Sequence, residues 1–263
     1  RMFGKASLFG MLSKNLLSLC KSQKSGTRIL LAIPSNQYSL FVDLRPEVER
    51  VTMIPYHSSE CWMTYKTKAY ITLLKTTLQN EKNIVFVEGD QIYFRDVRVA
   101  LPSQIYFDVA FTLQPSGEIE YGYFYVKESS SRVLKLLSEV QAILKKKTPQ
   151  KARCPYKYND QDALAEALDS PKYIEKKTEF ENVYVTKYGL HWLAREANKV
   201  RDIPQHKFYR GRGPYRPGTC SPKNNSVYIH FKGGRKIIML HKPCIHEVYE
   251  LQEKNVNTCI SQV

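Results

Sequence analysis

The chain has 263 residues, of which 43% are hydrophobic and 12% aromatic, so its composition excludes an intrinsically disordered protein and allows one large domain or two ordinary ones. Its 40 lysines and arginines exceed its 25 acidic residues, which gives a formal net charge of +15. The sequence contains no run of 18 apolar residues and therefore predicts no transmembrane helix.

The excess positive charge is confined to two stretches of the sequence. Residues 1–42 hold six cations and no acid, and residues 203–246 hold nine cations and no acid. In the rest of the chain 25 cations balance 25 acids. Because cations beside phosphates release condensed counterions, this pattern indicates nucleic acid as the partner, in preference to an anionic membrane or a generally basic surface.

Two features of the sequence bear on localisation. Residues 1–28 are basic and free of acids, and Phe9, Leu12, Leu16 and Leu19 fall on one helical face. This pattern is typical of a mitochondrial transit peptide, and the alternative is a retained basic amphipathic arm in another compartment. The six cysteines are scattered without a Cys-x-x-Cys pair, which disfavours a disulfide framework and favours a reducing compartment.

Residues 29–147 are expected to form a β-rich α+β domain with about seven or eight antiparallel strands and two helices. Three short apolar runs between residues 29 and 56 are separated by prolines and predict strands. Residues 61–79 favour a helix by their length, although their five threonines also suit a strand.

Two hairpins and a helix complete this expected domain. The first hairpin begins at Asn83 and turns at residues 88–90. The second begins at Gln104 and turns at residues 115–117, where proline presets the turn and glycine tolerates positive φ. A helix over residues 129–147 has serines at its start, a leucine-rich and valine-rich stripe, and three lysines at its end.

The remainder of the chain is expected to form two further parts. Residues 148–202 predict a linker and a helical region, with a capped helix near residue 160 and a second helix within residues 183–202. Residues 203–263 predict a basic loop, a β-hairpin turning at Gly233-Gly234, and a C-terminal helix.

The segment HKFYRGRGPYRPGT, residues 206–219, alternates arginines with tyrosines and glycines. Arginine binds phosphate with a planar fork and stacks on bases, and tyrosine stacks unpaired bases. Glycine lets the backbone approach closely, and a basic hairpin tip follows downstream. These features predict an RNA-binding site formed by Lys207, Tyr209, Arg210, Arg212, Tyr215, Arg216, Lys232, Arg235 and Lys236.

Other chemical sites have weaker support in the sequence. His241, Cys244 and His246 lie close together, but their spacing matches no zinc pattern. Asp108 and Glu120 of the second hairpin would be the ligands of Mg²⁺ in a nuclease, although hairpins commonly carry acids on a solvent-facing side. The sequence lacks the common nucleotide-binding and hydrolase motifs, so we expect no metal and no cofactor, and we favour a protein without catalysis.

One predicted strand contains three tyrosines at alternate positions. Tyr121, Tyr123 and Tyr125 share a strand face, as base-stacking aromatics do in some RNA-binding sheets. Glu118 and Glu120 nearby make a poor phosphate surface. These tyrosines are therefore expected to pack within the sheet.

Together these patterns predict an α+β protein that binds RNA as a non-catalytic structural or assembly component of a large ribonucleoprotein, such as a mitochondrial ribosome or an RNA-processing complex. RNA and neighbouring proteins of that complex are the expected partners. A nucleic-acid-acting enzyme such as a metal-dependent nuclease is the first alternative, and a viral or nuclear DNA-binding protein is the second.

Overall fold

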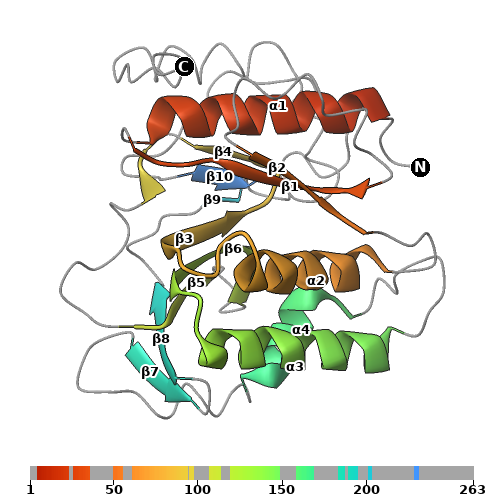
Figure 1. The fold of residues 1–263 in the computed structure, drawn as a ribbon, viewed down its shortest axis with the longest axis vertical. Coiled ribbons are helices and arrows are strands. Elements are labelled where there is room, and N and C mark those ends of the chain that lie inside the picture. The colour runs from red at the N-terminus through yellow and green to blue at the C-terminus, as the bar shows by residue number, and fades with distance from the viewer. Residues whose placement is uncertain are drawn as a thin grey trace. The chain divides into compact units, whose positions relative to one another are not determined.

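The computed structural model describes residues 5–23, 26–35, 50–55, 61–93, 95–97, 107–113, 119–148, 158–168, 183–186, 189–194, 201–202 and 228–230. They form a mixture of helices and strands, which confirms the α+β class (Figure 1). The chain divides into two compact units, each assembled from segments far apart in the sequence. Unit 1 comprises Arg1–Met53, Glu88–Leu101 and Asn198–Val263, and unit 2 comprises Ile54–Val87 and Pro102–Ala197.

The described residues form helices and small sheets. The helices are α1 (Lys5–Ser22), α2 (Trp62–Lys75), α3 (Ser131–Lys147) and α4 (Asp160–Ala167). The strands are β1 (Leu30–Pro34), β2 (Arg50–Ile54), β3 (Lys82–Val87), β4 (Gln91–Tyr93), β5 (Val109–Leu113), β6 (Ile119–Glu128), β7 (Val183–Thr186), β8 (Gly189–Ala194), β9 (Arg201–Asp202) and β10 (Tyr228–His230). Within the described part of the chain, no helix combines the length and the apolar character needed to cross a membrane.

In unit 1, the basic helix α1 lies along β4 (Figure 1). Its buried side chains include apolar Met11, Leu16 and Leu19. Its buried polar side chains form hydrogen bonds with the backbone near β4. Asn15 donates to the carbonyl oxygens of Glu88 (3.1 Å) and Gln91 (2.8 Å). Ser18 accepts from the N–H of Tyr93 (3.0 Å), and Gln23 accepts from the N–H of Val97 (3.1 Å). The amphipathic segment is thus packed into unit 1 as a structural element.

The predicted hairpin at residues 88–90 is wrong. β3 belongs to the sheet of unit 2, whereas β4 pairs antiparallel with β10, which pairs in parallel with β9. Gly89 does not have the positive φ of a tight hairpin turn; a Cβ there would lie 3.3 Å from Cδ1 of Leu12 on α1. The glycine therefore provides space for the helix, and long-range pairing outweighs the local turn signal.

The five-stranded sheet of unit 2 has the order β3-β6-β5-β8-β7. β5 and β6 pair antiparallel with Phe111 opposite Phe124, which confirms the second predicted hairpin. The helix predicted within residues 183–202 is wrong, because β8 pairs in parallel with β5 and antiparallel with β7. Residues 29–147 contribute strands to three different sheets, so the single β-rich domain of seven or eight strands is not confirmed.

The helices α2, α3 and α4 gather beside the strands of unit 2 (Figure 1). The helix expected from the length of residues 61–79 is confirmed as α2. For α3, Ser130 caps the start by accepting from the N–H of Val133, and the buried stripe is Val133, Leu136, Leu137, Val140 and Leu144. For α4, Asn159 and Asp162 form a capping box, which confirms the capped helix expected near residue 160.

Candidate nucleic-acid interface

The RNA-binding residues expected from the sequence lie outside the residues that the structure describes. These residues are Lys207, Tyr209, Arg210, Arg212, Tyr215, Arg216, Lys232, Arg235 and Lys236. The same holds for His241, Cys244 and His246 and for the predicted C-terminal helix. Among the residues that are described, no group of three histidine, cysteine or acidic side chains is placed to hold a metal ion.

The two acids considered as nuclease ligands are not brought together by the sheet. Asp108 directly precedes β5, and its carbonyl oxygen accepts from the N–H of Lys127. Glu120 lies opposite Thr112 of β5. Thr112 is four residues beyond Asp108, which corresponds to about 13 Å along the strand at the usual rise per residue. The buried carboxylate of Asp108 instead faces Arg132 of α3 at 3.9 Å. The geometry therefore does not support a shared ion between these two acids.

The three tyrosines of β6 are buried, as the sequence predicted. Tyr121, Tyr123 and Tyr125 are at most 4% exposed, so none of the three presents a face on which a base can stack. Tyr121 and Phe124 stack with ring centroids 5.4 Å apart, and Tyr70 of α2 meets both rings edge-on. Tyr121 and Phe124 of this strand form core between α2 and the sheet.

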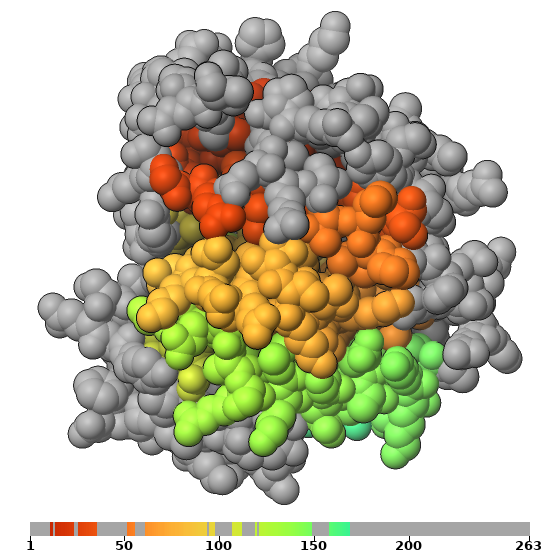
Figure 2. Space-filling model, in the orientation of Figure 1, coloured from red at the N-terminus to blue at the C-terminus, as the bar shows by residue number. Residues whose placement is uncertain are grey.

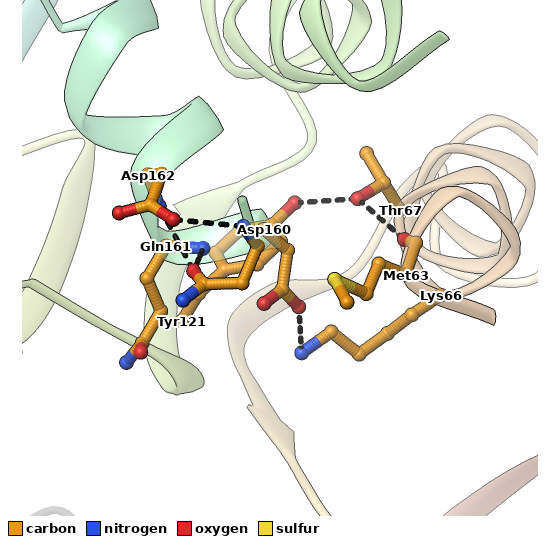
Figure 3. A network of polar contacts seen from close by, with 8 residues as sticks. Met63, Lys66, Thr67, Tyr121, Asp160, Gln161 and Asp162 are labelled. Atoms are coloured by element: carbon orange, nitrogen blue, oxygen red, sulfur yellow. Dashed lines mark hydrogen bonds and ion pairs between the residues drawn. The ribbon is translucent and has the colours of Figure 1, made fainter. Parts of the chain in front are cut away.

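A buried polar network joins α2, β6 and α4 (Figure 3). Lys66 of α2 forms an ion pair with Asp160, the first residue of α4, and their side chains are only 14% and 8% exposed. The ammonium of Lys66 also lies over the rings of Tyr121 (5.1 Å) and Trp62 (5.5 Å). The charge of this lysine is thus compensated inside the protein and is not offered to a ligand.

The hydroxyl of Tyr121 completes this network. It donates to Oγ1 of Thr67 at 3.4 Å, and Thr67 in turn donates to the carbonyl oxygen of Met63 (3.3 Å) (Figure 3). Desolvation by burial raises the pKa of Tyr121, because the phenolate would be charged within the core. This tyrosine is therefore a neutral donor and not an acid-base group near neutral pH.

The helices of unit 2 are strongly segregated in charge. α2 contains three lysines and no acid, whereas α3 contains five cations and the single acid Glu139. α4 contains three acids and no cation, and Glu166 of α4 lies 3.8 Å from Lys147 at the end of α3. The acids of α4 thus compensate Lys66 of α2 and Lys147 of α3.

The cations on the outer side of α3 are arranged differently. We define the α3 outer face as the exposed residues Ser131, Arg132, Lys135, Ser138, Glu139, Ala142, Lys145 and Lys146. At 100° per residue they fall on the side opposite the buried stripe. In Figure 2, α2 and α3 lie next to each other on the visible surface. This face carries four cations and one acid.

A shallow groove lies where the end of α2 meets this face. It is lined by Lys75 of α2 together with Ser131, Leu134, Lys135, Ser138 and Glu139 of α3. Ammonium groups and hydroxyl groups are the donors that most often contact phosphate oxygens. The groove and the α3 outer face therefore form the candidate anion-binding surface of the described residues.

Sequence reasoning missed this surface because it counted charge along the chain. Outside the two basic stretches the totals balance, yet residues 61–80 contain three lysines and no acid. Folding places that acid-free segment beside α3, while the acids of α4 pair with Lys66 and Lys147 and not with Lys75 or Lys135. The absence of acids from residues 61–80 was the feature of the sequence that could have indicated this basic surface.

One cysteine also departs from expectation. Cys61, which is buried and directly precedes α2, is disulfide-bonded, whereas Cys20 of α1 is buried and is not part of a disulfide. The scattered spacing of the cysteines does not predict this bond.

No protein-family model matches the chain, and no curated protein matches it. The function must therefore be argued from the charge and the geometry of its own residues.

Proposed function

We propose that this protein binds RNA as a non-catalytic structural or assembly component of a large ribonucleoprotein, with neighbouring proteins of that complex as further partners. The observation that carries this proposal is the segregation of charge: residues 203–246 contain nine cations and no acid. Uncompensated cations concentrated in one segment favour a polyanion, because each contact with a phosphate releases counterions. The basic helical layer of unit 2 adds support from the fold.

The composition of residues 206–219 favours RNA over duplex DNA. Three arginines alternate with two tyrosines in a glycine-rich and proline-rich segment. Arginine planes and tyrosine rings stack on unpaired bases, which RNA loops and single strands present and a regular duplex hides. As part of this proposal, residues 203–263 form a basic loop, a hairpin and a C-terminal helix that together approach the RNA.

A mitochondrial location is the second part of the proposal. It is supported by the basic amphipathic segment at residues 1–28. Because α1 contributes buried side chains to unit 1, we infer that this segment stays attached to the folded protein. Imaging of the tagged full chain, combined with N-terminal sequencing of protein recovered from the organelle, tests both points. A cytosolic signal would refute the location, and recovery without residues 5–22 would refute the retention of α1.

The test of RNA binding measures how affinity depends on salt. Fluorescence anisotropy with a labelled single-stranded RNA should give a steep decrease of log K with log salt concentration in the full chain. Changing Arg210, Arg212 and Arg216 to alanine should lower that slope by about two, at roughly 0.7 for each lost contact with a single strand. Changing the same residues to lysine is the matched control, because it preserves charge and should preserve the slope while weakening stacking.

Two results would contradict the proposal. An alanine variant with an unchanged salt slope would show that these arginines do not contact phosphate. A clear preference for duplex DNA over RNA of the same length would favour a DNA-binding protein instead.

A further inference from the structure

We propose that the α3 outer face, together with Lys75 at the end of α2, is a second RNA contact, which binds the phosphate backbone without reading bases. This inference rests on the proposed function and adds a site in a part of the chain whose total charge is balanced. It places RNA on a rigid helical surface in addition to the glycine-rich segment.

The first argument is the state of the charges. Within the described residues, Lys75, Lys135, Lys145 and Lys146 are exposed and take part in no ion pair, whereas Arg132 pairs with the buried carboxylate of Asp108 at 3.9 Å. Lys66 and Lys147 are likewise matched by acids of α4. The fold thus leaves the charges of Lys75, Lys135, Lys145 and Lys146 available to a partner.

The second argument is the spacing of the cations. Lys135 lies near the start of α3, beside Lys75 in the groove, and Lys145 and Lys146 lie in its last turn. Ten residues separate Lys135 from Lys145, which corresponds to about 15 Å along the helix axis. A strand of nucleic acid places several phosphates within that length. The two groups of cations can therefore engage one strand together.

The third argument is what the face lacks. α3 contains no aromatic residue, so its outer face has no platform for a base. Ser131, Ser138 and Ala142 are small, which allows a sugar-phosphate backbone to approach closely. The same absence of aromatic anchors disfavours a protein partner, and the absence of a broad apolar face disfavours insertion into a membrane surface. The surface suits phosphate contacts that position RNA.

The experiment uses the full chain and a labelled RNA hairpin with a duplex stem. A variant with Lys75, Lys135, Lys145 and Lys146 changed to glutamine should lower the salt slope by about three, at roughly 0.7–0.9 for each contact. Glutamine has nearly the helix propensity of lysine, so far-UV circular dichroism should be unchanged.

Single substitutions on α3 provide matched controls. Lys146→Gln should lower the slope by slightly less than one, whereas Lys147→Gln, one residue away, should leave it nearly unchanged because Glu166 already compensates Lys147. Glu139→Gln should strengthen binding by removing the only acid of the face. This last variant decides the question even if the fourfold variant does not fold.

The possible results distinguish a failure of this second site from a failure of the proposed function. If the full chain binds RNA and responds to the arginine substitutions at residues 210–216, but the α3 variants bind as the unchanged protein does, the second site is refuted and the proposed function stands. If the full chain fails to bind RNA, both are refuted. If the α3 variants instead lose binding to an acidic peptide or to phosphatidylserine vesicles, while RNA binding is unaffected, the face serves another polyanion and this inference is wrong.

Discussion

The ion pair between Lys66 and Asp160 allows the packing of unit 2 to be tested directly. Changing Lys66 to methionine keeps an unbranched side chain of similar size, but it removes the ammonium, its ion pair with Asp160 and its contacts with the rings of Trp62 and Tyr121. Asp160, whose side chain is only 8% exposed, would then be left as a buried carboxylate without its cation. We expect this change to detach α4 from α2 and to destabilise unit 2.

The size of the effect follows from the burial of the two groups. Removing one partner of a buried ion pair costs about 3–5 kcal/mol, because the remaining charge is desolvated without compensation. Asp160→Asn should fall near the lower end of that range, since Lys66 is 14% exposed and can reach water. The double variant should cost no more than either single change, which gives a coupling energy of at least about 3 kcal/mol.

Urea unfolding followed by tryptophan fluorescence measures these free energies. Both tryptophans of the chain, Trp62 and Trp192, belong to unit 2, so the signal reports on that unit. The matched control is Lys147→Met, which breaks a pair to Glu166 whose side chains are nearly half exposed, and it should cost less than about 1 kcal/mol. Equal costs for Lys66→Met and Lys147→Met, or additive effects in the double variant, would refute the reasoning.

Two further changes test unit 2 and unit 1 separately. Burial raises the pKa of Tyr121, so the folded protein keeps a proton that the unfolded chain loses above about pH 10. The contribution of Tyr121 to stability is therefore complete below that pH and decreases as the pH rises. Tyr121→Phe should reduce the decrease of the urea midpoint between about pH 9 and pH 11. An identical fall in the variant would assign the effect to other groups. Asn15→Ala should destabilise unit 1 by about 1–3 kcal/mol, because the carbonyl oxygens of Glu88 and Gln91 lose a buried donor. Hydrogen exchange at the amides of β4 measures this, and unchanged protection would show that α1 does not hold the strand.

The candidate site was only partly accessible from the sequence. The cations of the α3 outer face are visible in the sequence, and their helical spacing follows from the periodicity of Val133, Leu137, Val140 and Leu144. What could not be predicted is which cations keep an uncompensated charge. Lys146 and Lys147 are neighbours in the chain, yet only Lys147 is matched by an acid of α4. That difference depends on where α4 packs, which is a long-range contact.

The sequence by itself determined the elements whose signals are local. The cap and apolar stripe of α3, the capping box of α4, and the pairing of β5 with β6 each follow from residues close in the chain, because caps, periodicity and turns act over a few positions. Three features were decided only by the tertiary structure. Residues 189–194 form a strand paired with β5, β4 pairs with β10 and not with β3, and Lys66 forms an ion pair with Asp160. Strand pairing and buried charge depend on partners more than 80 residues away, and such partners override weak local preferences.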